Sequence, residues 1–285
     1  MSISILALSS CVLLRCANPE TSSPQRTINF IAGGHAYGSH SGTNEGLYPK
    51  FQNALQTVSA IDYLVLVGDI VRVSNEAAWD SVANQLAPFA FEKLFVLGNH
   101  DNSDYARTLF IGTYGNTFYA VNESTFTFII LDCQKPWGTI PQEQLTFIKQ
   151  QIDARPAIGL VFVFFHELLW TQGKDEYSHV AHNFGTYDGQ FITNFWGELY
   201  PLLSGYSAKK FYIIAGDVAG TTGAIPAFYE EVGNVTLIAT GMGQIQDENY
   251  LKVSVCNTTV NFSLVALNDS NSLQPLEYYT PANLK

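Results

Sequence analysis

The chain has 285 residues, of which 47% are hydrophobic and 14% are charged, and its formal net charge is −11 at pH 7. This composition is typical of a globular protein with a large core, and it excludes a disordered chain or a coiled coil. Binding to a nucleic-acid backbone requires basic patches, so no nucleic acid is expected as a partner.

The N-terminus is the first distinct segment. Residues Ile3–Leu14 are mostly apolar, and the Pro/Ser-rich segment Asn18–Arg26 follows. We interpret residues 1–25 as a leader or lipoprotein signal with a polar tether. Cys11 follows Leu8-Ser9-Ser10, as at a lipoprotein processing site, and Cys16 is the alternative position. This predicts an exported protein, periplasmic or at the cell surface, whose only membrane contact is an N-terminal lipid anchor; an untargeted cytoplasmic protein is the alternative.

Two further cysteines, Cys133 and Cys256, lie far apart in the sequence. They are too few for a disulfide framework or a cysteine-based metal cluster. We expect two lone thiols in the core, and a single bridge in an oxidising compartment is the alternative.

Short apolar runs, each ending in a polar residue, recur along the chain. They are rich in Val, Ile and Phe and lack alternation, which is typical of strands buried on both faces. The runs are 28–35, 63–69, 94–101, 126–132, 160–166 and 211–217.

Helical spacing separates several of these runs, at 47–59, 75–90 and 141–154. Alternating strands and helices predict a largely parallel sheet that helices cover, an α/β fold. The strand-like segments 235–240, 250–256 and 259–267 follow with little helix between them. We expect them to form a final antiparallel segment that completes a second sheet. No linker interrupts residues 26–270, which are predicted to be one domain, with 271–285 as a tail.

Polar side chains at the strand ends form the candidate site. Ligands of open α/β sheets bind beyond the carboxyl ends of the strands. Each side chain alone has a structural interpretation, as a helix cap or a hydrogen-bonded histidine. Together they are a set of oxygen and nitrogen donors that suits a divalent metal such as Mn, Fe, Zn or Mg. The residues are His35, Asp69, Asn99, His100, Asp101, Asp132, His166 and Asp217.

Three motifs give the chain a family resemblance. Gly68-Asp69-Ile70, Gly98-Asn99-His100-Asp101 and Phe164-Phe165-His166-Glu167 follow one another at predicted strand ends. In this order they resemble the motifs of the calcineurin-like metallophosphoesterases, and the resemblance runs from about residue 28 to residue 267. It implies a two-sheet, four-layer α/β/β/α sandwich flanked by helices.

The resemblance also implies roles for the motif residues. The family holds two metals, bridged by the aspartate that corresponds to Asp69, and these metals clamp the phosphate and activate the attacking water. Asn99 and His166 would bind one of the metals. His100 would stabilise the phosphate or protonate the leaving oxygen, and Asp101 would orient His100. The substrate would be a small phosphoester.

Two motifs depart from the family pattern. The first family motif is Asp-x-His, and here Gly33 stands in the place of the aspartate while His35 is kept. The last is Gly-His-x-His, and here Asp217 and Ala219 replace both histidines. We therefore predict one or two bound ions. One well-formed site has the ligands Asp69, Asn99, His166 and Asp217, and the weakened second site keeps only His35 and Asp69.

Other histidines are candidates to restore the weakened site: His40, and His179 with His182 in the loop after His166. Ordinary exposed loop histidines are the alternative interpretation. The aromatic residues Trp170, Tyr177 and Phe184 of this loop suit a substrate pocket or, more plainly, a packed lid.

The sequence leaves two functions open. The first is a metal-dependent phosphoester hydrolase, and the second is a catalytically inactive relative that serves as a binding or scaffold protein. A Ser- or Cys-based hydrolase is disfavoured, because no Ser or Cys lies in a nucleophile elbow. The pattern makes no prediction about the oligomeric state.

Overall fold

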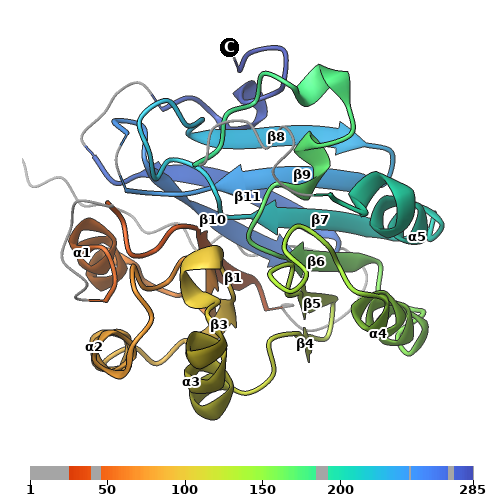
Figure 1. Ribbon diagram of the computed structural model, residues 1–285. Helices are drawn as coiled ribbons and strands as arrows, with labels where there is room; N and C mark the ends of the chain where they lie inside the picture. The colour runs from red at the N-terminus through yellow and green to blue at the C-terminus, as the bar shows by residue number, and fades with distance from the viewer. Residues whose placement is uncertain (1–25, 40–45, 184–191, 244, 269–272, 285) are drawn as a thin grey trace, which may run out of the picture.

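The computed structural model describes residues 26–39, 46–183, 192–243, 245–268 and 273–284. These residues form two β-sheets that face each other, with helices on both outer faces (Figure 1). The α/β/β/α sandwich expected from the motifs is therefore confirmed.

The first sheet has the strand order β11-β10-β1-β2-β3. Strands β1, β2 and β3 are parallel, whereas β10 pairs antiparallel with both β1 and β11. The bounds are β1 Ile28–Gly33, β2 Tyr63–Val67, β3 Glu92–Val96, β10 Asn249–Cys256 and β11 Thr259–Ala266.

The second sheet has the order β4-β5-β6-β7-β9-β8, in which β5, β6, β7 and β9 are parallel and the two edge strands are antiparallel. The bounds are β4 Tyr119–Asn122, β5 Phe126–Ile130, β6 Leu160–Phe164, β7 Lys210–Ala215, β8 Ala227–Val232 and β9 Val235–Thr240.

Helices cover the two outer faces. Helices α1, α2 and α3 lie beside the first sheet, and α4 and α5 lie beside the second (Figure 1). The side chains of Asn75 and Ser103 cap α2 and α3 by accepting hydrogen bonds from Ala78 N and Ala106 N. The bounds are α1 Pro49–Thr57, α2 Glu76–Leu86, α3 Asp104–Tyr114, α4 Gln142–Asp153 and α5 Tyr200–Ser204. Shorter helical turns span Asn99–Asp101, Leu169–Thr171, Asp175–Tyr177, Phe195–Leu199 and Leu276–Tyr278.

Aromatic side chains fill the space between the sheets. Phe30 of β1 meets Phe128 of β5 and Phe162 of β6 edge to face, with ring centroids 5.0 and 5.1 Å apart. All five residues of β2, β5 and β6 are buried, as expected for strands covered on both faces. This packing fixes how the carboxyl ends of the strands in the two sheets face each other.

The prediction for the C-terminal strands is wrong in two respects. Strand β9 runs parallel to β7, and the hairpin β10–β11 extends the first sheet through antiparallel pairing with β1. The described part of the predicted tail packs on the domain, where Leu276 and Tyr279 are buried and Tyr229 N of β8 donates to Tyr279 O.

The cysteines also differ from the expected pair of core thiols. Cys133 is a free, buried cysteine, but Cys256 is disulfide-bonded. Among the described residues, none of the helices is both long enough and apolar enough to cross a membrane.

Candidate metal centre

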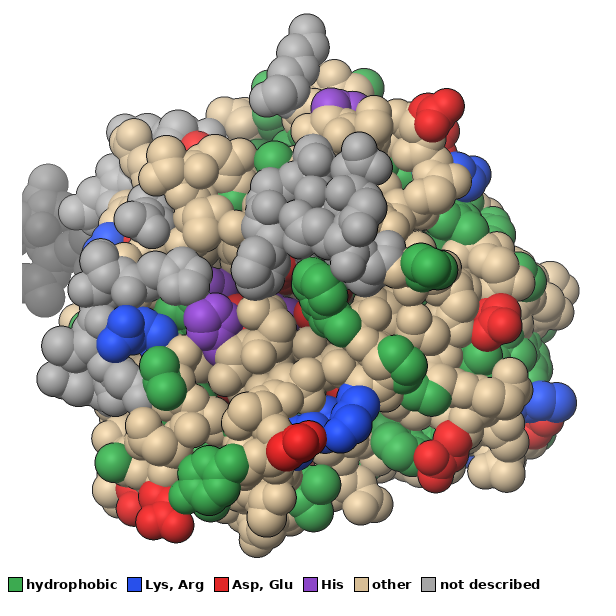
Figure 2. Space-filling model, in the orientation of Figure 1, with side chains coloured by type: hydrophobic (Ala, Val, Ile, Leu, Met, Phe, Trp, Pro, Cys, Tyr) green, Lys and Arg blue, Asp and Glu red, His purple; other side chains and the backbone are tan. Residues whose placement is uncertain are grey.

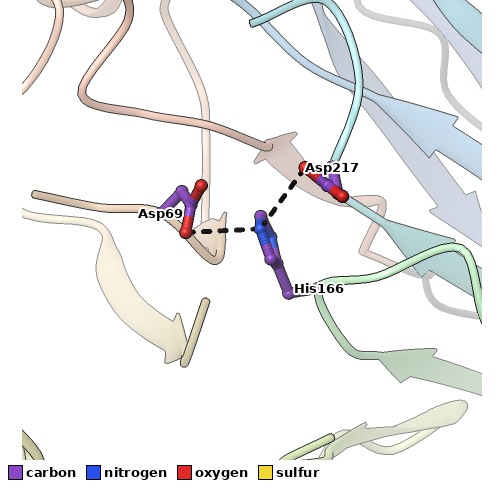
Figure 3. A group of neighbouring side chains, drawn as sticks. All are labelled: Asp69, His166 and Asp217. Carbon is purple, nitrogen blue, oxygen red and sulfur yellow. Dashed lines mark ion pairs between the residues drawn. The ribbon is translucent and has the colours of Figure 1, made fainter. Parts of the chain in front are cut away.

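His166 lies between two carboxylates at the carboxyl ends of β2, β6 and β7 (Figure 3). Its Nε2 atom is 3.3 Å from Asp69 Oδ1 and 3.8 Å from Asp217 Oδ1. All three side chains are buried, and they offer donor atoms within 4.8 Å of one another. The structure thus brings together one imidazole and two carboxylates that come from distant parts of the sequence.

The other nitrogen of His166 determines what Nε2 can do. His166 Nδ1 lies 2.9 Å from Val67 O, and a carbonyl oxygen only accepts, so Nδ1 carries a hydrogen. In the neutral ring, the lone pair of Nε2 then faces the two carboxylates, and Nε2 has no hydrogen-bond partner among the described residues. Burial lowers the pKa of His166, but Asp69 and the other nearby carboxylates raise it more, well above its usual value. Either a proton or a metal cation is needed at Nε2.

Asp69 contacts both sides of the site. Its Oδ1 accepts a hydrogen bond from His100 N at 3.0 Å, and its Oδ2 lies 3.8 Å from His35 Nε2. Burial raises the pKa of Asp69, but His166, His100 and His35 lower it more, so the carboxyl ionises below its usual range. The two oxygens of one carboxylate therefore face two different imidazoles, an arrangement that suits a bridging ligand.

The backbone at the site is strained. His35, Asp69 and Ala219 have left-handed φ angles of 54°, 51° and 61°, which non-glycine residues rarely adopt. Gly68 leaves no room for a side chain, because a Cβ atom there would lie 2.3 Å from His166 Nδ1. Such strain is typical of functional sites and persists only where the surrounding structure enforces it.

Asn99 lies at the same sheet edge. A Cβ atom on the preceding Gly98 would be 2.1 Å from Asp69 N, and His100 on the other side bonds to Asp69 Oδ1. Asn99 Oδ1 is buried and has no hydrogen-bond partner in the described ranges. A buried amide oxygen without a hydrogen bond is costly, and a cation would satisfy it.

The sequence predicted that Asp101 orients the imidazole of His100, but the Asp101 carboxylate does not bond to that ring. Its carboxylate accepts hydrogen bonds from the backbone of Ile70, Val71 and Gly98 at 3.1 to 3.2 Å. Burial and the charge of Asp69 raise the pKa of Asp101 to about 7 despite these donors. Asp101 therefore holds the Gly-Asp loop against the Asn-His-Asp turn.

His100 is oriented by two other groups. Its Nδ1 lies 2.7 Å from Arg72 O, and its Nε2 lies 3.3 Å from the hydroxyl of Tyr37. The ring of Tyr37 packs on His35, with centroids 4.2 Å apart. Tyr37 was not among the residues predicted from the sequence, where its only signal is its place two residues after His35. Histidine side chains reach the surface on this face of the molecule (Figure 2).

Other residues from the predicted set have structural roles. Asp132 pairs with Arg107 at 2.5 Å and is not a member of the close donor group of Asp69, His166 and Asp217. Trp170 and Tyr177 are buried in the core, as the packed-lid interpretation predicted, and Phe184 and His40 lie outside the described residues.

The two loop histidines differ. His179 is exposed and bonds to Pro281 O at 2.8 Å. His182 is buried, with Nδ1 4.0 Å from Asp217 Oδ2, and burial lowers the pKa of His182 to about 3, so its imidazole is neutral.

Comparison with known proteins places this chain in a family. The model of the family described as calcineurin-like phosphoesterase matches residues 35–198, more than half of the chain. The chain belongs to the calcineurin-like phosphoesterase family. No curated protein sequence matches it.

Solved structures to which the chain is similar include Vps29 from Chaetomium thermophilum, at 10% identity and a TM-score of 0.39, with 87% of this chain and 92% of that chain covered. Protein TM1076 from Thermotoga maritima has 13% identity and a TM-score of 0.38, with coverage of 84% and 99%.

Proposed function

We propose that this protein is a metal-dependent phosphoester hydrolase with one well-formed cation site. The observation that supports this most is the position of His166 Nε2, a buried nitrogen 3.3 Å from Asp69 Oδ1 and 3.8 Å from Asp217 Oδ1. This nitrogen and the two carboxylates repel one another unless a positive charge, a proton or a cation, lies between them. A divalent cation supplies that charge, and Asn99 Oδ1 adds a neutral oxygen donor.

The donor set fits hard to borderline cations. Two carboxylates, one imidazole and one amide oxygen suit Mn, Fe, Zn or Mg. When bound, such a cation polarises a phosphoryl oxygen and makes water a better nucleophile at neutral pH.

His100 is the residue best placed to act on the substrate. It is partly exposed, whereas the ligand carboxylates are buried. Its backbone bonds to Asp69 and its ring is held by Arg72 O and Tyr37, so its position is fixed relative to the cation site. We infer that His100 contacts the phosphate and stabilises its charge or protonates the leaving oxygen.

The degenerate motifs favour a second candidate, a relative that binds metal without turnover. Gly33 and Ala219 carry no ligand atoms where the family places an aspartate and a histidine. Only His35 then remains beside the second oxygen of Asp69. A second metal normally shares the charge of the attacking and leaving oxygens, so its weakening lowers the rate.

An assay of the purified chain separates the two candidates. Metal content and hydrolysis of a generic aryl phosphate are measured with added Mn²⁺. We expect turnover that falls at least 100-fold in Asp69→Asn and in His100→Ala, because one loses a ligand charge and the other the group at the phosphate. Asp104→Asn and His179→Ala, which change exposed residues, are the matched controls and keep full activity.

The possible outcomes differ clearly. Stoichiometric metal without turnover supports the inactive relative. Turnover that survives Asp69→Asn contradicts the proposed role of this site. A chain with neither bound metal nor turnover contradicts both candidates.

A further inference from the structure

Asp217 lies between two imidazoles. Its Oδ1 faces His166 Nε2 at 3.8 Å, and its Oδ2 faces His182 Nδ1 at 4.0 Å. All three side chains are buried. His182 belongs to the long loop between β6 and β7, far in sequence from the family motifs, yet it reaches the position where the last motif has lost its histidines.

The segment that carries His182 is attached to the loop that follows β7. Three hydrogen bonds join the residues on either side of His182 to this loop: Ile225 N donates to Ala181 O at 2.7 Å, Asn183 N to Asp217 O at 3.2 Å, and Gly220 N to Asn183 Oδ1 at 2.6 Å. The backbone therefore fixes where His182 lies relative to Asp217.

The distance between His182 and Asp217 is that of two ligands of one cation. Direct hydrogen bonds between N and O are about 2.7 to 3.2 Å long. Two donors that each lie about 2.1 Å from a cation are at most about 4.2 Å apart. The observed 4.0 Å lies outside the first range and within the second. Few protein ligands are needed, because hard cations such as Mg²⁺ keep several waters.

We propose that His182 is a metal ligand, supplied by the loop between β6 and β7 in place of the imidazoles missing from the last motif. Among the described residues, Asp69, His166 and Asp217 form the mutually close donor group. His182 therefore defines a second cation position, on the oxygen of Asp217 that faces away from His166. This inference rests on the metal centre of the proposed function.

Calorimetric titration of the full chain with Mn²⁺ tests the inference without relying on activity. We expect the wild type to bind two equivalents of Mn²⁺, one tightly and one weakly. In His182→Ala the weaker equivalent is lost or its affinity falls by about 10- to 100-fold, while the tight one stays within about threefold. His182→Gln behaves in the same way, because it keeps the side-chain volume but not the imidazole. His179→Ala, three residues earlier in the same loop, is the matched control and titrates like the wild type.

Each alternative outcome has a defined meaning. If His182→Ala still binds two equivalents of Mn²⁺ with wild-type affinities, the inference is overturned. It is also overturned if the weaker equivalent is lost in His35→Ala but not in His182→Ala. One equivalent in the wild type overturns the inference but leaves the proposed function intact, and no binding at all overturns both. If neither His182 variant folds by circular dichroism, histidine-selective ¹⁵N NMR of the wild type decides. The His182 ring nitrogen shifts with the second equivalent of Zn²⁺ if the inference is correct and does not shift if it is wrong.

Discussion

The hydroxyl of Tyr37 and the carbonyl of Arg72 contact the two ring nitrogens of His100 and hold its imidazole in place. Because Arg72 O only accepts, Nδ1 of His100 carries a hydrogen. Nε2 lies 3.3 Å from the Tyr37 hydroxyl, from which it accepts in the neutral ring and to which it donates in the protonated ring that the proposed role requires. Burial, followed by the charges of Asp69, Asp217 and Asp101, raises the pKa of Tyr37 far above its usual value, so the phenol stays a donor. Tyr37 thereby positions the residue expected to contact the substrate.

Replacing Tyr37 with Phe tests this role. Tyr37→Phe keeps the ring contact with His35 and removes only the hydroxyl. We expect kcat for the aryl phosphate to fall about tenfold, which corresponds to one lost hydrogen bond of about 1.4 kcal/mol, with KM and Mn²⁺ affinity unchanged. Tyr48→Phe, which removes a hydroxyl that bonds to Glu248, is the control. An unchanged kcat in Tyr37→Phe would show that this contact does not position His100.

The site residues at strand ends could be predicted, because each one follows a short apolar run that marks a buried strand. Asp69 and His166 each end a buried apolar run, and the structure brings them to 3.3 Å. Tyr37 and the backbone partners of Asp101 could not be predicted, because their contacts depend on how two loops pack. His182 was a candidate only through its residue type and its place in the loop after His166.

At the scale of the elements, strands that form clear apolar runs were predictable, and the two edge strands of the second sheet were not. Strands β2, β5 and β6 are uniformly buried apolar runs, which the sequence shows directly. Strands β4 and β8 are half-exposed and were missed. The partner of β10 is β1, more than 200 residues earlier in the chain, and no local pattern encodes such a pairing.

Strand β4 also connects the two sheets through one hydroxyl. Tyr119 Oη accepts a hydrogen bond from Phe95 N of β3 at 2.8 Å and donates to Phe95 O at 3.2 Å. Burial raises the pKa of Tyr119 to about 12. The contact therefore joins the edge strands β3 and β4 of the two sheets at a point where no backbone ladder does.

This contact predicts a stability change at alkaline pH. The unfolded tyrosine ionises near pH 10 and the folded one near pH 12, so the stabilisation is complete below pH 10 and is lost as the pH rises to 12. Between these values, the free energy of unfolding of the wild type should fall faster than that of Tyr119→Phe, by up to about 1.4 kcal/mol per pH unit. Urea titrations at a series of pH values measure both slopes. If the free energies of unfolding of the two proteins fell equally with pH, Tyr119 would have the same pKa in the folded and the unfolded state, which would contradict this prediction.

At the scale of the whole molecule, the core and the donor group are separate. The core between the sheets is apolar and aromatic, and Asp69, His166 and Asp217 lie together at one edge of the sandwich. The two-sheet architecture could be predicted from strand and helix alternation together with three short motifs. The predicted leader, lipid anchor and export concern residues 1–25, which lie outside the described residues, and they stay predictions.

Anomalous diffraction from a crystal of the protein grown with Mn²⁺ would show whether a cation binds among these donors. We expect an anomalous peak about 2.2 Å from Asp69 and from donor atoms of His166, Asp217 and Asn99. A map with no peak at this position, and with His166 Nε2 occupied by a direct hydrogen bond to a protein group, would contradict this expectation.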